Sequence, residues 1–321
     1  MGYFLSGPCY TEPVRWWRTP GYLLWSALAA TLWCSPNAGA QLSIEAVRSR
    51  AALPLSAAPT AAAPAIGEAR ALRGLSLLQE AHAAAARGHR SLTYGEAQTA
   101  IFSYTDNLEY DGTRGVYAAY SEVFVPGTGR SGGTYKEHGD ANGDGYVDSG
   151  GMNVEHTWPQ SFFKKRLPMK SDLHHLMPTF MHPNGMRGRL PFGTVSGGDA
   201  DYGTRSGARR GGGVFEPPDS AKGRVARCVL YFYVRYLGTN ILPRDFVESF
   251  WNSKIELMLA WNRAYPPSEF ERWRNDRVQE VQGNRNPFVD EPSLADQIGA
   301  DAFRLSAGFS AYAKSPIQPR R

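Results

Sequence analysis

The chain has 321 residues, and its 42% apolar and 12% aromatic content is that of a globular protein with a buried core, which excludes a wholly disordered chain. The formal net charge of +5 is compatible with a polyanionic partner but too small to require one. Charge alone therefore does not identify a nucleic-acid-binding protein.

The first forty residues have the pattern of an export signal. Arg15 and Arg18 supply a positively charged start, and the apolar stretch at 22–33 is too short to span a bilayer. Small residues at 38–40 form a cleavage site. We therefore expect residues 1–40 to be a signal peptide, with an uncleaved membrane anchor as the alternative. The mature protein is then secreted or periplasmic and has no membrane segment.

Only one cysteine remains after this cleavage. Cys9 and Cys34 lie in the signal, so Cys228 has no partner and the mature chain has no internal disulfide. Because Cys228 lies in an apolar helical stretch, we expect a buried structural thiol there and not a nucleophile.

Composition divides the rest of the chain into three parts. Residues 41–66 are rich in Ala and Pro and are expected to be a linker. Residues 67–292 are expected to form one folded domain, and residues 293–321 a tail with weak periodicity.

Periodicity and capping residues predict the elements of this domain in order. A helix is expected over 67–88, a short helix begins with the capping box of Thr93 and Glu96, and a strand is expected over 116–125. The segment 127–213 is rich in Gly and Pro. Three helices are expected after it, over 220–238, over 243–265, and from the cap at Ser268 to Gly283. These elements predict an α+β fold with a mainly helical scaffold.

A possible structural calcium loop lies within the Gly-rich segment. Its oxygen donors would alternate along the chain, and Gly145 would allow the sharp turn. The ligands would be Asp140, Asn142, Asp144, the backbone carbonyl of Tyr146, and Asp148. The twelfth position is Gly151 and not the bidentate Glu of an EF-hand, so a turn without any metal is an equal alternative.

The residues best suited to phosphodiester hydrolysis follow this loop. His156 can deprotonate a water near neutral pH, whereas Glu155 and Asn184 supply the oxygen ligands that a hard cation such as Mg²⁺ prefers. Positively charged side chains for the phosphate are Arg187, which is also a candidate catalytic residue, and the phosphate-binding candidates Lys164, Lys165 and Arg166. Four histidines cluster between 156 and 182, but no thiol lies near them, which disfavours a zinc site.

The adjacency of Glu155 and His156 sets a geometric condition. On a regular strand neighbouring side chains face opposite ways. Both residues can reach one hydrated ion only if the strand ends or bulges there, and Pro159 is consistent with an ending strand.

Several separated motifs resemble the endonuclease I family of bacterial nucleases, which are secreted or periplasmic and contain a ββα-metal motif. The matching segments are Glu155-His156-Thr157-Trp158-Pro159-Gln160-Ser161, Ser171-Asp172-Leu173-His174-His175-Leu176, Asn184-Gly185-Met186-Arg187-Gly188, Lys222-Gly223-Arg224-Val225-Ala226-Arg227, Trp261-Asn262-Arg263-Ala264-Tyr265-Pro266, and Gln282-Gly283-Asn284-Arg285-Asn286-Pro287-Phe288-Val289. The similarity extends over about 72–292, in the family's order.

This resemblance implies roles at matching positions. It implies that His156 is the general base and that Glu155 and Asn184 bind the metal ion. The phosphate-binding arginine of the family has no clear counterpart, and the shorter connection here contains Lys164, Lys165 and Arg166 instead.

The sequence therefore predicts a secreted, divalent-metal-dependent, nonspecific endonuclease that hydrolyses DNA, with RNA open as a second substrate. Magnesium or another divalent cation is the expected cofactor, calcium a possible additional one, and no obligate protein partner is evident. The alternatives are a non-catalytic nucleic-acid-binding protein on the same scaffold and another secreted metallohydrolase.

Overall fold

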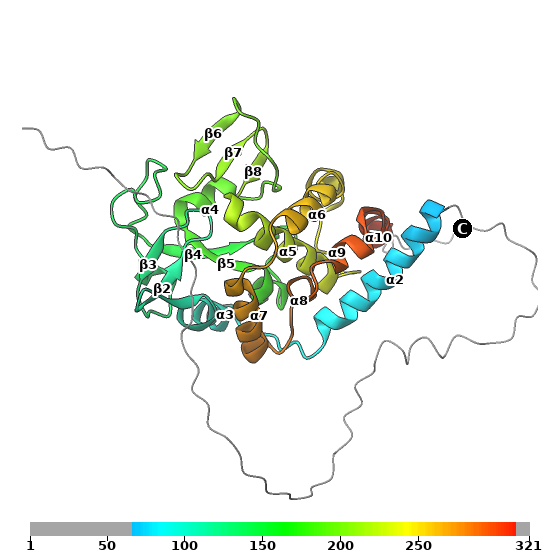
Figure 1. Ribbon diagram of the computed structural model, residues 1–321, viewed down its shortest axis with the longest axis horizontal. Coiled ribbons are helices and arrows are strands. Elements are labelled where there is room, and N and C mark those ends of the chain that lie inside the picture. Colours follow the sequence, from blue (N-terminus) through cyan, green and yellow to red (C-terminus); the bar gives the residue numbers. More distant parts are fainter. Residues whose placement is uncertain (1–65, 313–321) are drawn as a thin grey trace, which may run out of the picture. The chain divides into compact units, whose positions relative to one another are not determined.

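A computed structural model describes residues 66–312, and Figure 1 shows the arrangement of their helices and small sheets. The expected signal peptide and nearly all of the expected linker lie outside the described residues. The helices are α2 (Ile66–Ala86), α3 (Tyr94–Ala100), α4 (Met181–Arg187), α5 (Asp219–Arg235), α6 (Ile255–Ala264), α7 (Glu269–Gln282), α8 (Pro287–Asp290), α9 (Leu294–Ile298) and α10 (Ala300–Tyr312). Within this range, no helix combines the length and the apolar character needed to cross a membrane.

The strands form three small antiparallel sheets, so the predicted α+β fold is confirmed. The first contains β1 (Asn107–Tyr110), β2 (Thr113–Tyr117) and β3 (Phe124–Pro126). The second pairs β4 (Met152–His156) with β5 (Leu176–Phe180), and the third contains β6 (Ala200–Gly203), β7 (Arg209–Gly211) and β8 (Val214–Glu216).

Capping residues in the sequence predict several helix ends that the structure confirms. Thr93 and Glu96 form the predicted capping box at α3, which continues as a π-helical turn over Ile101–Thr105. The Ser268 side chain accepts a hydrogen bond from the backbone of Glu271, and Gly283 ends α7 with a φ of 90°. These devices depend only on neighbours in the chain, which is why the sequence shows them.

Two expected elements differ in the structure. The segment 116–125 is not one strand, because it turns back on itself and pairs Val116 of β2 with Val125 of β3. Glu122 adopts a left-handed φ of 55° within this turn. The helix expected over 243–265 begins with a 3₁₀ turn and a π-helical turn over Val247–Asn252, and regular helix starts only at Ile255.

The main core surrounds α5, which is buried along almost its whole length. Helices α2 and α6 pack against α5, and α9 and α10 pack against α2 (Figure 1). Ile298 and Phe303 are buried in this cluster, so the folded core continues past residue 292 into the segment expected to be a tail. Cys228 is buried in α5, and burial raises the pKa of its thiol to about 11, as expected for a structural cysteine.

A second, smaller core supports the β4–β5 hairpin. Val154, Leu176 and Phe180 from the hairpin pack with Phe102 and with Val116 of β2. The two sheets also meet where the amide of Ala119 donates to the carbonyl of Pro178 over 2.9 Å. The hairpin therefore rests on buried apolar contacts and not only on its own strand pairing.

A buried ion pair connects this region to α7. Arg274 and Arg224 both donate to Asp106 Oδ1, over 2.8 and 2.7 Å, and Arg274 also donates to the carbonyls of Leu173 and Leu176 at the start of β5. Burial alone would raise the pKa of Asp106, but the two guanidinium groups outweigh it and the pKa is lowered. Asp106 therefore stabilises the fold in its ionised form.

We expect Asp106→Asn to lower the free energy of unfolding by about 3–5 kcal/mol, because it leaves the buried Arg274 without its counter-charge. Urea denaturation at neutral pH measures this. The wild-type stability that depends on Asp106 should be present above the carboxyl's unfolded-state pKa and should be lost as the pH falls through the lowered folded-state pKa.

The matched control is Asp201→Asn, which removes an exposed carboxylate paired with Arg210 at the surface. Exposed ion pairs contribute little, so this variant should unfold close to the wild type. Equal losses in the two variants would contradict the importance of the buried pair.

Candidate active site

The predicted catalytic and metal-binding residues lie on the β4–β5 hairpin and the helix that follows it. The strands pair antiparallel and without a bulge, from Met152 opposite Phe180 to His156 opposite Leu176. Helix α4 begins directly after β5 and contains Asn184 and Arg187. Figure 1 shows α4 beside this hairpin, so two strands and a helix assemble the predicted ββα arrangement.

Glu155 is a buried carboxylate with an unusual set of neighbours. It is 1% exposed, and its Oε1 lies 2.8 Å from Arg187 Nη1 but receives no hydrogen bond. Burial is the largest influence and raises the pKa of Glu155, while Arg187 partly offsets it. The buried hydroxyl of Tyr120 lies close by and also has no hydrogen-bond partner. An oxygen without a donor in a buried position is suited to bind a cation.

Asn184 is held in place by an asparagine on β4. Its Nδ2 donates to Asn153 Oδ1 over 2.6 Å, which leaves the Asn184 carbonyl oxygen as the available ligand atom. Asn153 precedes Glu155 by two residues, so both side chains leave β4 on the same face. The alternation of side chains along β4 would predict that Asn153 lies on the same face as Glu155, but the sequence alone indicates no role for it.

Arg187 is buried within the protein and does not extend into solvent. It is 1% exposed, and it donates to the carbonyls of His156 and Thr157 over 2.8 and 2.6 Å. The guanidinium group also lies 4.5 Å from the ring of Phe192. These contacts make Arg187 a link between α4 and the end of β4, and the phosphate contact expected from the sequence stays a prediction.

His156 is the last residue of β4, so the strand does end where the geometric condition requires. Its Nε2 lies 3.0 Å from the carbonyl of Lys170, and its ring stacks on Tyr94 and meets His175 edge-on. Burial, followed by His175, lowers the pKa of His156 to about 3, so the ring is neutral at pH 7. Its contacts come from α3 and from the loop before β5, whereas Glu155 contacts α4.

The predicted phosphate-binding residues are exposed in the loop after β4. Lys164 and Lys165 both have left-handed backbones, with φ of 57° and 54°, which costs conformational energy in non-glycine residues. Arg166 donates to the carbonyls of Phe163 and Asn240. All three side chains are therefore exposed on one loop, and the fold holds Lys164 and Lys165 of this loop in an unfavourable backbone conformation.

Lys170 is a positively charged residue that the sequence analysis did not single out. Its ammonium lies 4.0 Å from the centre of the Tyr94 ring, and its carbonyl accepts from His156. The ring of Tyr94 also stacks on His156, so Lys170 is close to the predicted base. Its position just before the Ser171-Asp172-Leu173 motif was the one indication in the sequence. Its distance from His156 along the chain gave no sign that the two residues are close in space.

The two histidines of the Ser171–Leu176 motif are buried in the scaffold. His174 Nε2 lies 3.0 Å from the Asn284 carbonyl, and His175 Nε2 lies 2.7 Å from that of Met169. Asp172, also buried, accepts from the Tyr231 and Tyr236 hydroxyls and from Gln282. This motif therefore joins the hairpin to α5 and to the end of α7.

The possible calcium residues form an ordered loop before β4. Asp140 Oδ1 and Oδ2 accept from the amides of Asp144 and Gly145, each over 3.0 Å. Burial, followed by the carboxylates of Glu137 and Asp144, raises the pKa of Asp148. Across residues 66–312, no three His, Cys, Asp or Glu side chains are positioned as a ready metal cage.

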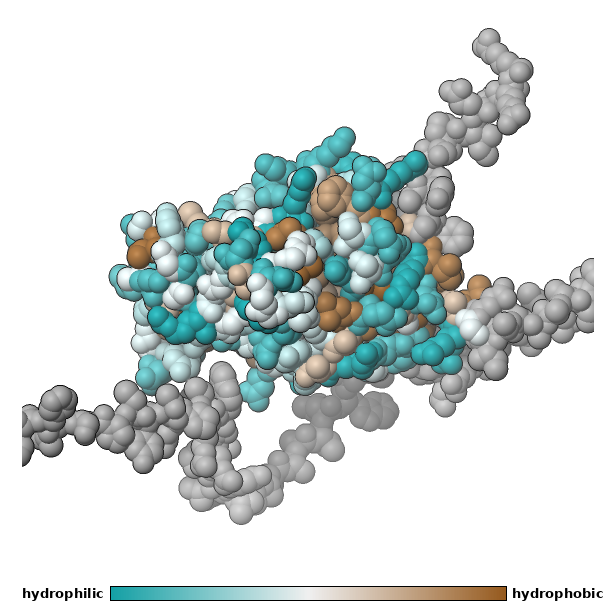
Figure 2. Space-filling view, turned by 90° about the horizontal axis from the view of Figure 1, so that it is seen from above, coloured by the Kyte–Doolittle hydropathy of each residue, from teal (hydrophilic) through white to brown (hydrophobic). Residues whose placement is uncertain are grey.

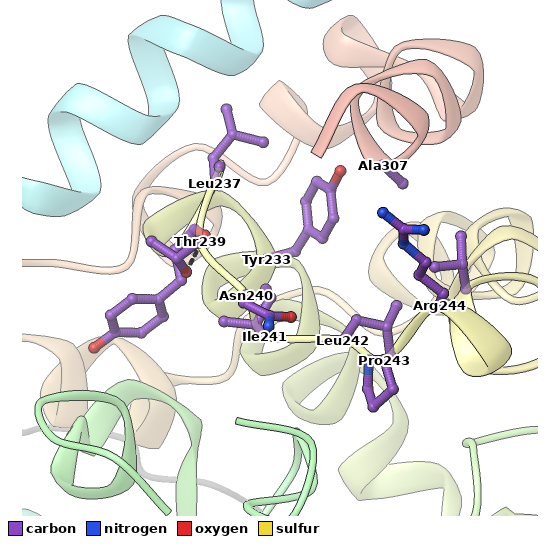
Figure 3. A pocket seen from close by; sticks show the side chains of 12 residues that line it. Tyr233, Leu237, Thr239, Asn240, Ile241, Leu242, Pro243, Arg244 and Ala307 are labelled. Carbon is purple, nitrogen blue, oxygen red and sulfur yellow. Dashed lines mark hydrogen bonds between the residues drawn. The ribbon is translucent and has the colours of Figure 1, made fainter. Parts of the chain in front are cut away.

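A cavity of about 250 Å³ is lined by none of the predicted site residues. It is lined by the end of α5, the loop 237–243 and the residues up to Val247, with Ala307 of α10 (Figure 3). Its lining contains no carboxylate and no histidine, so it lacks the groups for hydrolysis. The chemistry therefore favours the β4–β5–α4 site over this cavity.

Comparisons with known proteins find a matching family and several relatives. A family model described as Endonuclease I matches residues 78–293. The extracellular ribonuclease of Bacillus subtilis (strain 168) is 35% identical over 159 residues, which cover 46% of this chain and 54% of that protein. An extracellular deoxyribonuclease of Aeromonas hydrophila is 30% identical over 128 residues, which cover 38% of this chain and 50% of that protein. The chain thus spans about half the length of the relatives it matches.

The contact between Asn153 and Asn184 gives a prediction about metal affinity. We expect Asn153→Ala to weaken Mn²⁺ binding by about 10–100-fold, because Asn184 loses the partner that orients its amide. Titration of free Mn²⁺ by electron paramagnetic resonance measures this without reference to activity. The exposed Asn240→Ala is the control, and unchanged binding in Asn153→Ala would show that the contact does not orient a ligand.

Proposed function

Since the chain belongs to the endonuclease I family, we propose that it is a divalent-metal-dependent endonuclease whose active site is built on β4, β5 and α4. The observation that carries the proposal is a pair of contacts between β4 and α4. Glu155 of β4 lies against Arg187 of α4, and Asn184 of α4 donates to Asn153 of β4. We further propose that it acts outside the cytoplasm, as the names of its extracellular relatives suggest.

Glu155 and Asn184 are the residues that would hold the cation. The fit is supported by the Glu155 oxygen that has no hydrogen-bond donor and by the Asn184 amide that Asn153 orients. Two protein ligands suit Mg²⁺, which keeps several waters. When bound, such an ion supplies charge stabilisation for the phosphate and for the leaving oxygen.

His156 is proposed to accept the proton of the attacking water. An Nε2 proton directed at the Lys170 carbonyl selects the tautomer that leaves the lone pair on Nδ1, and the low pKa keeps the ring unprotonated. The water oxygen then forms a bond to phosphorus as the bond to the leaving oxygen breaks, and that oxygen takes up a proton. Tyr94 and His175 hold the ring on two sides.

Lys170 is the candidate for the positive charge that the family places near the phosphate. It is only partly buried and is the cation in closest association with the Tyr94–His156 stack. Lys164, Lys165 and Arg166 are proposed to bind the substrate backbone from the exposed loop. Arg187 is proposed to be a positioning residue, since its donors are directed at backbone carbonyls and Glu155.

The substrate is proposed to be DNA, with RNA as a second candidate. Relatives named as a ribonuclease and as deoxyribonucleases match the same chain, so the comparisons favour neither nucleic acid. Contacts directed at the phosphate backbone carry no sequence information, and this supports nonspecific cleavage.

Two other functions remain as outcomes of the test. A non-catalytic nucleic-acid-binding protein would retain the basic loop without the base and metal ligands, yet His156, Glu155 and Asn184 are all present. Another metallohydrolase would act on casein or on a small phosphoester and leave plasmid intact.

We expect purified protein to cleave plasmid in the presence of Mg²⁺ and to lose this activity with EDTA. His156→Ala should lower the cleavage rate by about 10²–10⁴-fold, because a general base contributes that much. DNA binding and the melting temperature should change little. Gel assays on plasmid, RNA and casein separate the three functions.

The control variant is His138→Ala, at an exposed histidine outside the site. It should cleave at the wild-type rate. His156→Ala with more than about half of the wild-type activity would end the assignment of the base, and EDTA-resistant cleavage would end the metal dependence.

A further inference from the structure

We propose that the segment from Glu137 to Asp148 binds a calcium-type cation, at a site separate from Glu155 and Asn184. The inference does not depend on the proposed function, because it rests on buried charge outside the active site.

The backbone of the loop already turns around the side-chain oxygens that would bind the cation. Asn142 Oδ1 accepts from the amide of Asp144 over 2.8 Å, and Asp144 Oδ1 accepts from that of Tyr146 over 2.9 Å. Gly143 and Gly145 have left-handed φ values of 70° and 83°. The chain therefore bends around its own oxygen donors, as a calcium loop requires, although an Asx-rich turn alone has the same features.

Buried negative charge is the observation that points to a ligand. The Asp144 side chain is 0% exposed, and Asp148 and Glu137 are 2% and 4% exposed. His182 is the only ion-pair partner that the described residues offer them, and no Lys or Arg pairs with any of the three. Buried carboxylates without counter-charges are strongly unfavourable, and a divalent cation would neutralise them.

Asp148 supplies the most specific sign of an absent partner. Its Oδ1 accepts from the amide of His182 over 2.9 Å, but its Oδ2 is buried without any hydrogen-bond donor. The Asp148 amide donates to Glu137 Oε2 over 2.9 Å, and His182 contacts both Asp148 and Asp144, so the three acidic residues lie close together. The unpaired oxygen therefore lies within the acidic cluster.

Glu137 adds a residue that the sequence motif does not contain. Its two oxygens accept from the amides of Asn142 and Asp148, over 2.8 and 2.9 Å, so it holds both ends of the loop together. The motif lacks a glutamate at its twelfth position, where Gly151 stands. Glu137 lies upstream and brings a further carboxylate to the loop.

The donor set selects the class of cation. Carboxylate, amide and backbone oxygens are the ligands of Ca²⁺, and the number available exceeds what Mg²⁺ takes from protein. Asp144 Oδ2 now accepts from the Tyr202 hydroxyl over 2.8 Å and lies 3.1 Å from His182 Nδ1. Binding would therefore draw Asp144 away from these two side chains and toward the ion, which explains why no ready cage is formed.

The site would be structural, and it would act on α4. His182 is the second residue of that helix and receives contacts from both Asp148 and Asp144, while Asn184 follows two residues later. A cation that fixes the loop would thus fix the start of the helix that carries a proposed catalytic-metal ligand.

The test is Ca²⁺ binding to the metal-stripped full chain, followed by titration calorimetry and thermal melting. We expect binding heat and a rise in Tm of about 5–10 °C at 100-fold excess over Kd. Tb³⁺, used as a Ca²⁺ substitute, should show luminescence excited through the nearby Tyr146 or Tyr202. Absence of heat, Tm shift and Tb³⁺ signal would overturn the proposal.

Variants locate the ion. Asp140→Asn, which changes an exposed carboxylate and should fold, should weaken Ca²⁺ binding at least 10-fold, and Asp148→Asn should do the same. Asp201→Asn, on β6, should not. An undiminished Tm shift in Asp140→Asn and Asp148→Asn would place the ion elsewhere and overturn the proposal.

A double variant separates the two metal sites. Glu155→Gln with Asn184→Ala removes the proposed catalytic ligands and should keep the Ca²⁺-dependent Tm shift. Loss of that shift would mean that Ca²⁺ binds only at the active site, which overturns a second site. Because none of these readouts is cleavage, the result is independent of whether the protein proves to be a nuclease.

Discussion

The arrangement of the site depends on one buried guanidinium group. Arg187 reaches from the last residue of α4 to the carbonyls of His156 and Thr157, and it lies against Glu155. A buried cation is costly, and the two carbonyls and the charge of Glu155 offset part of that cost, although Arg187 Nε has no hydrogen-bond partner. Asn184 lies three residues earlier on the same helix, so it shares a face with Arg187. The position of Asn184 relative to Glu155 therefore depends on Arg187, together with the hydrogen bond from Asn184 to Asn153 of β4.

The regular pairing of β4 explains how the base and the metal ligands are divided. Asn153 and Glu155 leave one face of the strand toward α4, whereas His156 contacts α3 and the loop before β5. Adjacent strand residues could face one site only through a bulge or at the end of the strand, and β4 ends at His156. Since Arg187 donates to the carbonyl of His156 itself, the side chain that lies against Glu155 also fixes the backbone of His156, the proposed base.

Local features were predictable from the sequence, and long-range ones were not. The capping box at Thr93 and the glycine that ends α7 depend on residues within one turn, and both are confirmed. The turn at Glu122 has no Gly-Asn or Pro-Gly signal, so the hairpin of β2 and β3 was read as one strand. Of the candidate site, Glu155 and Asn184 are predicted from their motifs, and their roles stay predictions. Lys170 is not predicted from the sequence, because it lies fourteen residues after His156 and only the fold brings it to Tyr94.

Charge compensation distinguishes the two acidic regions that flank β4. Glu155 already has a positive charge 2.8 Å away in Arg187, which reduces the attraction of its carboxylate for a cation. An ion held by the proposed ligands Glu155 and Asn184 would therefore be weakly bound and would exchange readily, as suits a catalytic ion that must accept and release substrate oxygens. Glu137, Asp144 and Asp148 have only His182 for their charge, so a cation there would gain the full attraction of three buried carboxylates. If both proposed sites bind metal, the fold would thus separate a labile position from a tight one by placing an arginine beside one carboxylate and none beside the others.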